Sequence, residues 1–338
     1  MTAATGSNAD SVRESMQKQI DAEHVNDFIN MMTSGGRTQM VADHDQLRKK
    51  ERHVYYFMRN PTRNRFSNVL LFNEGAIILD KHHKDETQYI HATRIKSTFG
   101  NYVLAQAPKS DTLLEWYRMI WQCRTQIIIC LLPLDNGKEC HKYFEKKAGK
   151  KVKCKRFTMK TSMIRQDGPM NVYEMRMTNN DAKGEEKERI LYIIHYPKWQ
   201  IGKQPDPRQL LKVMRSMWAL ESALQMANEK CEVTVLVHGC SGVRRTGAFV
   251  VSSMLCKQIR DRQTVSIVAA CSTVRRYRYG VMRNKQVFCT VLEMVFNFSA
   301  DQGLVDRMNQ NFVTCIKKTR EALLDHESGS RTRRDRDN

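Results

Sequence analysis

The chain has 338 residues, and 41% of them are hydrophobic, so it can bury the core of one large domain or of two ordinary ones. Lysine and arginine exceed aspartate and glutamate by 20, which favours acidic or phosphate-bearing partners over cationic ones. The longest charge-free apolar run, residues 125–134, is shorter than the roughly 18 residues of a membrane helix. Residues 1–12 lack a signal-peptide pattern. The ten cysteines include no zinc-type pairs, which predicts reduced thiols, no metal site and an intracellular, cytoplasmic protein.

The apolar pattern predicts a mixed α/β chain with helical ends. Apolar residues at steps of three to five predict an amphipathic helix over 11–32 that ends at Ser34-Gly35-Gly36, and a second helical stretch follows to about residue 52. The last residues, 327–338, contain no apolar side chain and are expected to be disordered. Strands are expected at 69–79, 88–95, 126–132 and 233–237, with a hairpin of 172–177 and 189–196, and further helices at 113–124, 210–230, 246–262 and from 265 onward.

A strongly basic segment extends from Lys142 to Lys160. It contains nine basic residues and one acidic residue, with the weak alternation that indicates exposed strands and turns. The favoured interpretation is a solvated surface, because runs of charge usually lie in solvent. Nucleic-acid binding is the less favoured alternative, since the segment lacks interleaved aromatic residues and a recognisable nucleic-acid-binding module.

A short polar loop joins the predicted strand at 233–237 to the helix that starts at Thr246. Successive backbone N–H groups of such a loop form a concave anion site, and the helix N-terminus adds about half a positive charge. An arginine at the base of the loop can hold two phosphate oxygens at once. The predicted phosphate-binding residues are His238, Gly239, Cys240, Ser241, Gly242, Val243, Arg244, Arg245 and Thr246.

This loop resembles the signature of the protein tyrosine phosphatases, which reads His-Cys, five residues, Arg, Ser or Thr, and Gly. His238, Arg245, Thr246 and Gly247 match it. The resemblance covers residues from about 64 to 298 and is that of a nematode-like domain of the receptor or non-receptor type with a degenerate active site. Further matches follow in order along the chain at Asn64-Arg65-Phe66, Tyr89-Ile90-His91-Ala92, Ala105-Gln106-Ala107-Pro108, Trp116, Met119, Trp121, Cys140, Tyr143-Phe144, Arg275, Arg278 and Gly280.

The resemblance implies a single α/β domain with a twisted mixed sheet flanked by helices. We expect this phosphatase-like domain at 53–300, and an N-terminal helical segment, 1–52, that packs on it. A C-terminal helix is expected at 301–326, and a disordered basic tail at 327–338. The resemblance also assigns Phe66 to stacking on a phosphotyrosine ring and places Trp199 in the substrate pocket.

The sequence departs from the family at the positions that carry chemistry. Gly239 stands where the family has its cysteine nucleophile, and Cys240 lies one residue later, out of the expected line of attack. The general-acid loop reads Trp-Pro-Asp in the family and Trp199-Gln200-Ile201 here, so that Ile201 replaces the proton donor. An alternative register places Gln204-Pro205-Asp206 at this loop. It is less favoured, because Asp206-Pro207 has the pattern of a helix cap followed by an N1 proline.

Four further departures concern binding and water positioning. Asn68 replaces an aspartate that orients the substrate backbone, and Gln122 stands where a glutamate pairs with the signature arginine. Arg283-Asn284 replaces a Gln-Thr pair associated with the hydrolytic water. Arg244 replaces a glycine, and it either adds a second cation for phosphate or fills the pocket mouth; an arginine there is strained if the position needs a positive φ.

The expected function is therefore that of a pseudophosphatase with no intact catalytic residues. It binds phosphotyrosine or an acidic protein and modulates phosphotyrosine signalling, as a monomer without cofactor, metal or nucleic acid. The alternative is an active or residual phosphatase that uses Cys240 and Asp206.

Overall fold

The computed structural model describes residues 23–46, 53–134, 137–200, 202–229 and 232–334. In this part of the chain, nine strands form one mixed sheet in the order β2-β3-β4-β10-β5-β9-β8-β7-β6. The pairs β4–β10, β10–β5 and β5–β9 are parallel, and the other pairs are antiparallel. The strands are β2 (Ala76–Ile78), β3 (Tyr89–Ser97), β4 (Gly100–Gln106), β5 (Thr125–Cys130), β6 (Lys151–Cys154), β7 (Phe157–Asp167), β8 (Met170–Asn179), β9 (Glu188–His195) and β10 (Thr234–Gly239).

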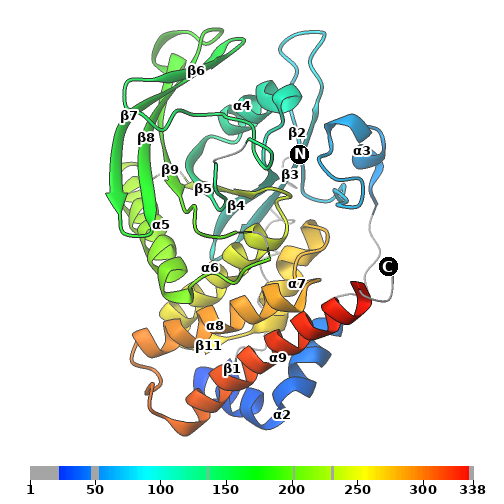
Figure 1. Cartoon of the computed structure of the whole chain (residues 1–338). Coiled ribbons are helices and arrows are strands. Elements are labelled where there is room, and N and C mark those ends of the chain that lie inside the picture. Colours follow the sequence, from blue (N-terminus) through cyan, green and yellow to red (C-terminus); the bar gives the residue numbers. More distant parts are fainter. Residues whose placement is uncertain (1–22, 47–52, 135–136, 201, 230–231, 335–338) are drawn as a thin grey trace, which may run out of the picture.

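Helices cover both faces of the central strands, with α4 on one face and a larger helical layer on the other (Figure 1). A second, two-stranded sheet pairs β1 (Glu23–His24) with β11 (Thr264–Val265). Short 3-10 segments lie at Pro61–Arg63, Ser110–Thr112 and Gly184–Lys187. The helices are α2 (Val25–Gln46), α3 (Tyr55–Met58), α4 (Leu113–Gln122), α5 (Pro207–Ala227), α6 (Arg244–Arg262), α7 (Ile267–Tyr277), α8 (Lys285–Asp301) and α9 (Gln310–Arg334).

Burial on both faces explains why β5 and β10 read as continuous apolar runs. In β10, Val235 and Val237 contact the helical layer that includes α6, whereas Leu236 packs in the cluster that includes α4. All three side chains are fully buried. Parallel strands covered on both faces require such apolar runs, and the expected α/β fold with a mixed, helix-flanked sheet is confirmed.

The N-terminal helix differs from the expectation. The structure describes it from Val25, and it continues through Ser34-Gly35-Gly36 to Gln46 instead of ending there. A glycine inside a helix costs about 1 kcal/mol relative to alanine. Burial of Phe28 and Met32 in the core beside α8 and α9 offsets this cost. Residues 11–22 of the predicted helix, and the end of the second stretch at 47–52, lie outside the described residues.

Three other expectations differ in extent from the elements of the structure. The strand predicted over 69–79 is reduced to Ala76–Ile78, because a turn precedes it and Gly75 has a φ of +74°. The tail predicted to be disordered from residue 327 lies in α9 as far as Arg334, and residues 335–338 lie outside the described part. A polar composition cannot supply a core, but it does not prevent a helix nucleated upstream from continuing. The segment 301–326 is likewise not one helix, since α8 ends at Asp301 and α9 begins at Gln310.

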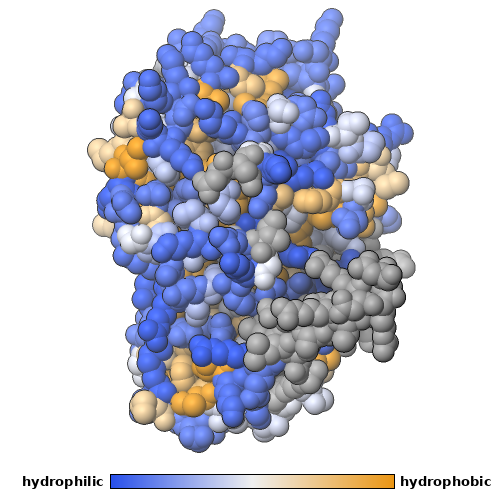
Figure 2. Space-filling model, in the orientation of Figure 1, coloured by the Kyte–Doolittle hydropathy of each residue, from blue (hydrophilic) through white to orange (hydrophobic). Residues whose placement is uncertain are grey.

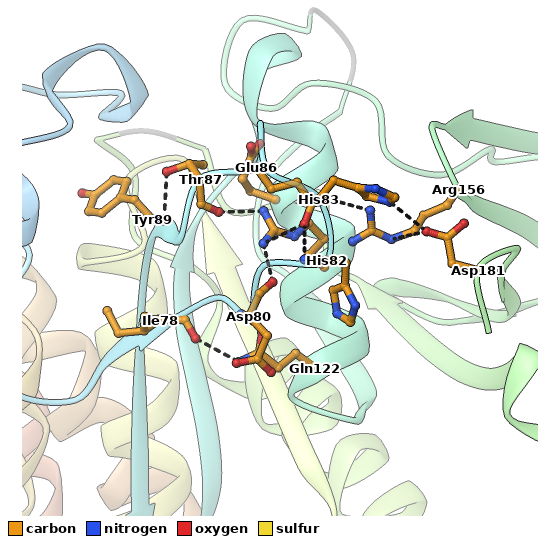
Figure 3. A network of polar contacts seen from close by, with 12 residues as sticks. Ile78, Asp80, His82, His83, Glu86, Thr87, Tyr89, Gln122, Arg156 and Asp181 are labelled. Carbon is orange, nitrogen blue, oxygen red and sulfur yellow. Dashed lines mark hydrogen bonds and ion pairs between the residues drawn. The ribbon is translucent and has the colours of Figure 1, made fainter.

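A buried ionic network attaches the segment between β2 and β3 to α4 and to the turn between β6 and β7 (Figure 3). The Glu86 carboxylate accepts hydrogen bonds from Arg156 and from the amide of His82, and it pairs with Arg118 at 3.2 Å. Burial would raise the pKa of Glu86, but these hydrogen bonds and the arginine charges lower it to about 2. Asp181, in the turn after β8, extends the network by contacting Arg156 and His83.

Among the described residues, no helix is long and apolar enough to cross a membrane.

Candidate functional site

The predicted strand, loop and helix around Gly239 have the expected order. Strand β10 ends at Gly239, and α6 begins at Arg244, two residues before the expected start. The loop therefore lies at the carboxyl end of a central strand with parallel neighbours on both sides. In open α/β sheets this edge is where ligands bind.

Hydrogen bonds from neighbouring segments turn the loop carbonyls away from the cavity. The amide of Ala107 donates to the carbonyls of Gly239 and Cys240 at 3.0 and 3.1 Å. The buried Arg278 guanidinium donates to the carbonyls of Ser241 and Gly242 at 3.1 and 2.9 Å. Within the described part of the chain, the amides of residues 240–243 have no acceptor, so this run of N–H groups is left for a ligand.

Gly242 supplies the left-handed turn that this curvature needs. Its φ is +67°, and an added Cβ would lie 2.2 Å from the carbonyl oxygen of Ala105. No other residue type fits there without backbone movement. Arg244 does not have a positive φ; it is the first residue of α6, with an exposed side chain at the cavity. The strain considered for an arginine at this position is therefore absent.

The Arg245 side chain is held by two acceptors. It donates to the carbonyl oxygen of Trp199 at 2.9 Å and to the Glu139 carboxylate at 2.5 Å. The side chains of Arg245 and Glu139 are 10% and 17% exposed, respectively. Glu139 thus fixes the guanidinium and leaves part of it open to the cavity.

This pairing corrects the role expected of Gln122. The Gln122 side chain instead bonds the amide of Asp80 and the carbonyl of Ile78, at 2.9 and 2.8 Å. Glu139 was not among the residues expected at the site, and it is separated from Arg245 by 106 residues. Its position directly before Cys140 in an otherwise matching segment was the available signal.

The floor of the cavity is formed by Gly239 and Thr246. A Cβ added to Gly239 would lie 3.5 Å from Thr246 Oγ1 and from Arg245 Nε, which is ordinary van der Waals contact. Gly239 has no positive φ, so the backbone would accept a side chain. Thr246 is fully buried, and its hydroxyl has no hydrogen-bond partner within the described residues. An unpaired buried hydroxyl therefore lines the floor next to the position that lacks a side chain.

His238 is a structural member of the loop. It is fully buried, its Nε2 lies 2.8 Å from the hydroxyl of Tyr143, and its ring meets Trp116 edge to face. Burial, with the neighbouring His195 and Arg245 acting in the same direction, lowers the pKa of His238 to about 3. The imidazole is therefore neutral at pH 7 and adds no charge to the site.

Neither residue of the alternative catalytic pair is arranged for chemistry. Burial raises the pKa of the half-buried Cys240 thiol, so it is protonated at neutral pH. Asp206 caps α5 by accepting from the amides of Arg208 and Gln209, at 2.9 and 3.4 Å, with Pro207 at N1. It is not part of the cavity wall, whereas Trp199 and Gln200 are. Ile201 lies outside the described residues.

The cavity has a volume of about 940 Å³. Phe66, 39% exposed, and Asn68 form part of its wall. Arg283 also lines the cavity, and its guanidinium donates to the hydroxyl of Tyr279 at 2.9 Å. Among the described lining residues there is no aspartate or glutamate, and the cationic ones are Lys203, Arg244, Arg245, Arg283 and Lys285. The cavity can therefore attract and bind an anion.

Comparison with known proteins matches the family described as Protein-tyrosine phosphatase to residues 60–297. Human tyrosine-protein phosphatase non-receptor type 5 is 27% identical over 230 residues, covering 65% of this chain and 38% of that protein. Tyrosine-protein phosphatase 3 of Dictyostelium discoideum is 23% identical over 277 residues, covering 76% and 27%. Tyrosine phosphatase H3 of Microplitis demolitor bracovirus is 20% identical over 263 residues, covering 70% and 81%. The chain thus spans less than half the length of the first two relatives.

Proposed function

Because this chain belongs to the protein-tyrosine phosphatase family, we propose that it is a catalytically impaired member that binds phosphotyrosine, or an acidic partner, and modulates phosphotyrosine signalling. The observation that carries the proposal is Gly239 on the floor of an otherwise complete anion site. The binding groups of the loop are retained, and the group expected to attack phosphorus is absent. In this proposal the protein acts inside the cell as a monomer and uses neither metal nor cofactor.

Binding is supported by three kinds of donor that converge on the cavity. The amides of residues 240–243 and the N-terminus of α6 favour negative charge. The guanidinium of Arg245 adds a charge-assisted hydrogen bond. The hydroxyl of Thr246 gains a partner when a phosphate oxygen reaches the floor. The ring of a phosphotyrosine then lies against Phe66 at the wall.

Loss of turnover is supported by the chemistry of four positions. Gly239 has no nucleophile, and Ile201 cannot donate a proton to a leaving phenolate. Loss of a general acid alone slows such a step by about two to four orders of magnitude. Cys240 is a protonated thiol, and Asp206 is engaged as a helix cap. The retained features therefore serve binding, and the missing ones serve reaction.

The charge of the cavity favours a ligand with more than one negative group. The described lining residues include five cations and no aspartate or glutamate, and of the five Arg245 is paired with Glu139 behind the lining. Asn68 makes the cavity less negative, because it is a neutral residue at a position where the family resemblance expects an aspartate. We therefore expect an acidic side chain next to the phosphotyrosine to strengthen binding, with an effect that salt reduces.

The experiment is a calorimetric titration of a phosphotyrosine peptide and its unphosphorylated twin into wild-type and Arg245→Ala protein. Wild-type protein should prefer the phosphorylated peptide, and Arg245→Ala should cost about 2–5 kcal/mol, because it leaves Glu139 unpaired as well as removing the phosphate contact. Arg208→Ala removes an exposed cation on α5 and serves as the control. Equal affinity for the two peptides would overturn phosphate recognition. Turnover of a small aryl phosphate that Cys240→Ser abolishes would overturn the impaired state.

A further inference from the structure

The outer face of the antiparallel end of the sheet carries a row of cations. In the strand register, Lys151 of β6 lies opposite Lys160 of β7, and Lys160 lies opposite Arg176 of β8. All three side chains are exposed. Lys153, two positions along β6 on the same face, is also exposed. We call Lys151, Lys160 and Arg176 the cation row. The pairing of β7 with β8 thus places Arg176 next to the basic segment 142–160 of the sequence.

The side chains of the cation row repel one another, because they lie opposite each other on neighbouring strands. Residues directly opposite each other in antiparallel strands have Cβ atoms about 4.5–5.5 Å apart, and like charges at that distance destabilise the pair. Arg176 has a partner, because its guanidinium bonds the Glu188 carboxylate at 2.6 Å. Within the described part of the chain, Lys151 and Lys160 have no carboxylate partner. An anionic ligand would therefore relieve a repulsion that the fold leaves in place.

The cation row also lies at the edge of the sheet, where a ligand can reach it. It crosses a shallow hollow of about 580 Å³ whose lining includes the hydroxyl residues Thr158, Ser162 and Thr178. Strand β6 is the edge of the sheet, and Figure 1 shows it far from the helical layer. The surface in Figure 2 is mostly hydrophilic, with separate apolar patches. An edge strand offers unpaired backbone groups to a further strand, and Lys151 and Lys153 stand at alternate positions beside them.

We propose that this surface docks an extended acidic segment of a partner protein, which pairs with β6 and places carboxylates beside Lys151 and Lys153, with Lys160 one strand further in. The period of two along a strand requires acidic residues at alternate positions of that segment. An acidic polypeptide is favoured over nucleic acid, because the residues that line the hollow include no aromatic side chain for base stacking.

This surface is separate from the phosphate site. Five strand-to-strand steps separate β10 from β6, which corresponds to about 24 Å at the usual strand spacing. Docking here is therefore independent of the proposed phosphotyrosine binding, and it would add a second contact for a partner that also occupies the cavity.

The test uses fluorescence anisotropy of a labelled peptide of four Glu-Val repeats with the full chain. Wild-type protein should bind it in a salt-dependent manner, and Lys151→Glu with Lys160→Glu should weaken binding by about tenfold or more. The control, Arg208→Glu with Lys317→Glu, makes the same charge change at exposed positions on α5 and α9 and should have little effect. A peptide with the four glutamates in one block should bind less tightly than the alternating one.

Three outcomes would overturn the proposal. Absence of measurable binding to the alternating peptide would remove the docking surface. Equal weakening by the cation-row variant and its control would indicate only general attraction to a basic protein. Tighter binding of single-stranded DNA than of the peptide, lost in the same variant, would indicate a nucleic-acid surface. Thermal unfolding of each variant checks that the fold is kept.

Discussion

Two arginine–carboxylate groups in this molecule differ in how they are enclosed. Glu86 is shared by Arg118 and Arg156, and the side chains of all three are at most 6% exposed. Arg245 pairs with Glu139 alone, both side chains remain partly accessible, and Arg245 also lines the cavity. The first group has its main charges neutralised inside the protein and serves the fold. The second keeps binding capacity because one side of the guanidinium faces a cavity without carboxylates.

The largest effect that follows from this difference concerns catalysis at the open site. Gly239→Cys should fold, because its Cβ meets only ordinary contacts, but it should hydrolyse a small aryl phosphate poorly. Adding Ile201→Asp, with Gln200→Pro, should raise turnover by about two to four orders of magnitude through restored leaving-group protonation. Steady-state kinetics of the single and triple variants measure this ratio. Efficient turnover by wild-type or by Gly239→Cys would contradict the assignment of position 201.

At the closed site the largest effect is on stability. Glu86→Gln leaves Arg118 and Arg156 buried without their shared carboxylate, which should lower the free energy of unfolding by about 3–5 kcal/mol. Urea unfolding measures the loss. Glu74→Gln is the matched control, because Glu74 pairs with Arg276 at the surface and should cost less than about 1 kcal/mol. Similar losses of unfolding free energy in the two variants would mean that burial of an ion pair does not determine its contribution to stability.

The Glu86 network also predicts a pH dependence. The pKa of Glu86 is about 2 in the folded protein, which is below its ordinary value of 4.5. The unfolded state therefore binds more protons in this range, so the Glu86 contribution is complete above pH 4.5 and decreases as the pH falls towards 2. Urea unfolding of wild-type and Glu86→Gln protein from pH 6 to about 2.5 should show their difference shrinking. A constant difference would contradict the lowered pKa.

The smallest predicted effect has opposite signs for stability and binding. Thr246→Val removes a buried hydroxyl without a partner among the described residues, so the free energy of unfolding should rise by about 1 kcal/mol. The same change should weaken phosphotyrosine-peptide binding by about 1.5–3 kcal/mol, because a hydrogen bond to a charged phosphate is lost. Ser252→Ala is the control: its buried hydroxyl on α6 is also unpartnered but does not line the cavity. Weaker binding in both variants would show that the floor hydroxyl is not a phosphate contact.

Local patterns were sufficient for the elements that carry the site. The apolar run at 126–132, the long helical pattern at 210–230 and the order of strand, loop and helix around Gly239 were all read from neighbouring residues. These elements depend on side-chain periodicity, on the positions of proline and glycine and on burial of a whole face. All three features can be recognised from residues that are close together in the chain. The substitution at position 239 is likewise plain in the sequence, because the positions around it match the family signature.

Only the tertiary structure decided which distant groups meet at the site. The partner of Arg245 could not be found from spacing, since Glu139 and Gln122 are both far from it in the chain and only the fold brings Glu139 to the guanidinium. The unpaired hydroxyl of Thr246 and the opposition of Lys151, Lys160 and Arg176 depend on loop geometry and strand register. The path of α2 through Gly35-Gly36 depends on packing beside α9. Such contacts are set by the free energy of the whole packed arrangement, which outweighs local preferences of about 1 kcal/mol per residue.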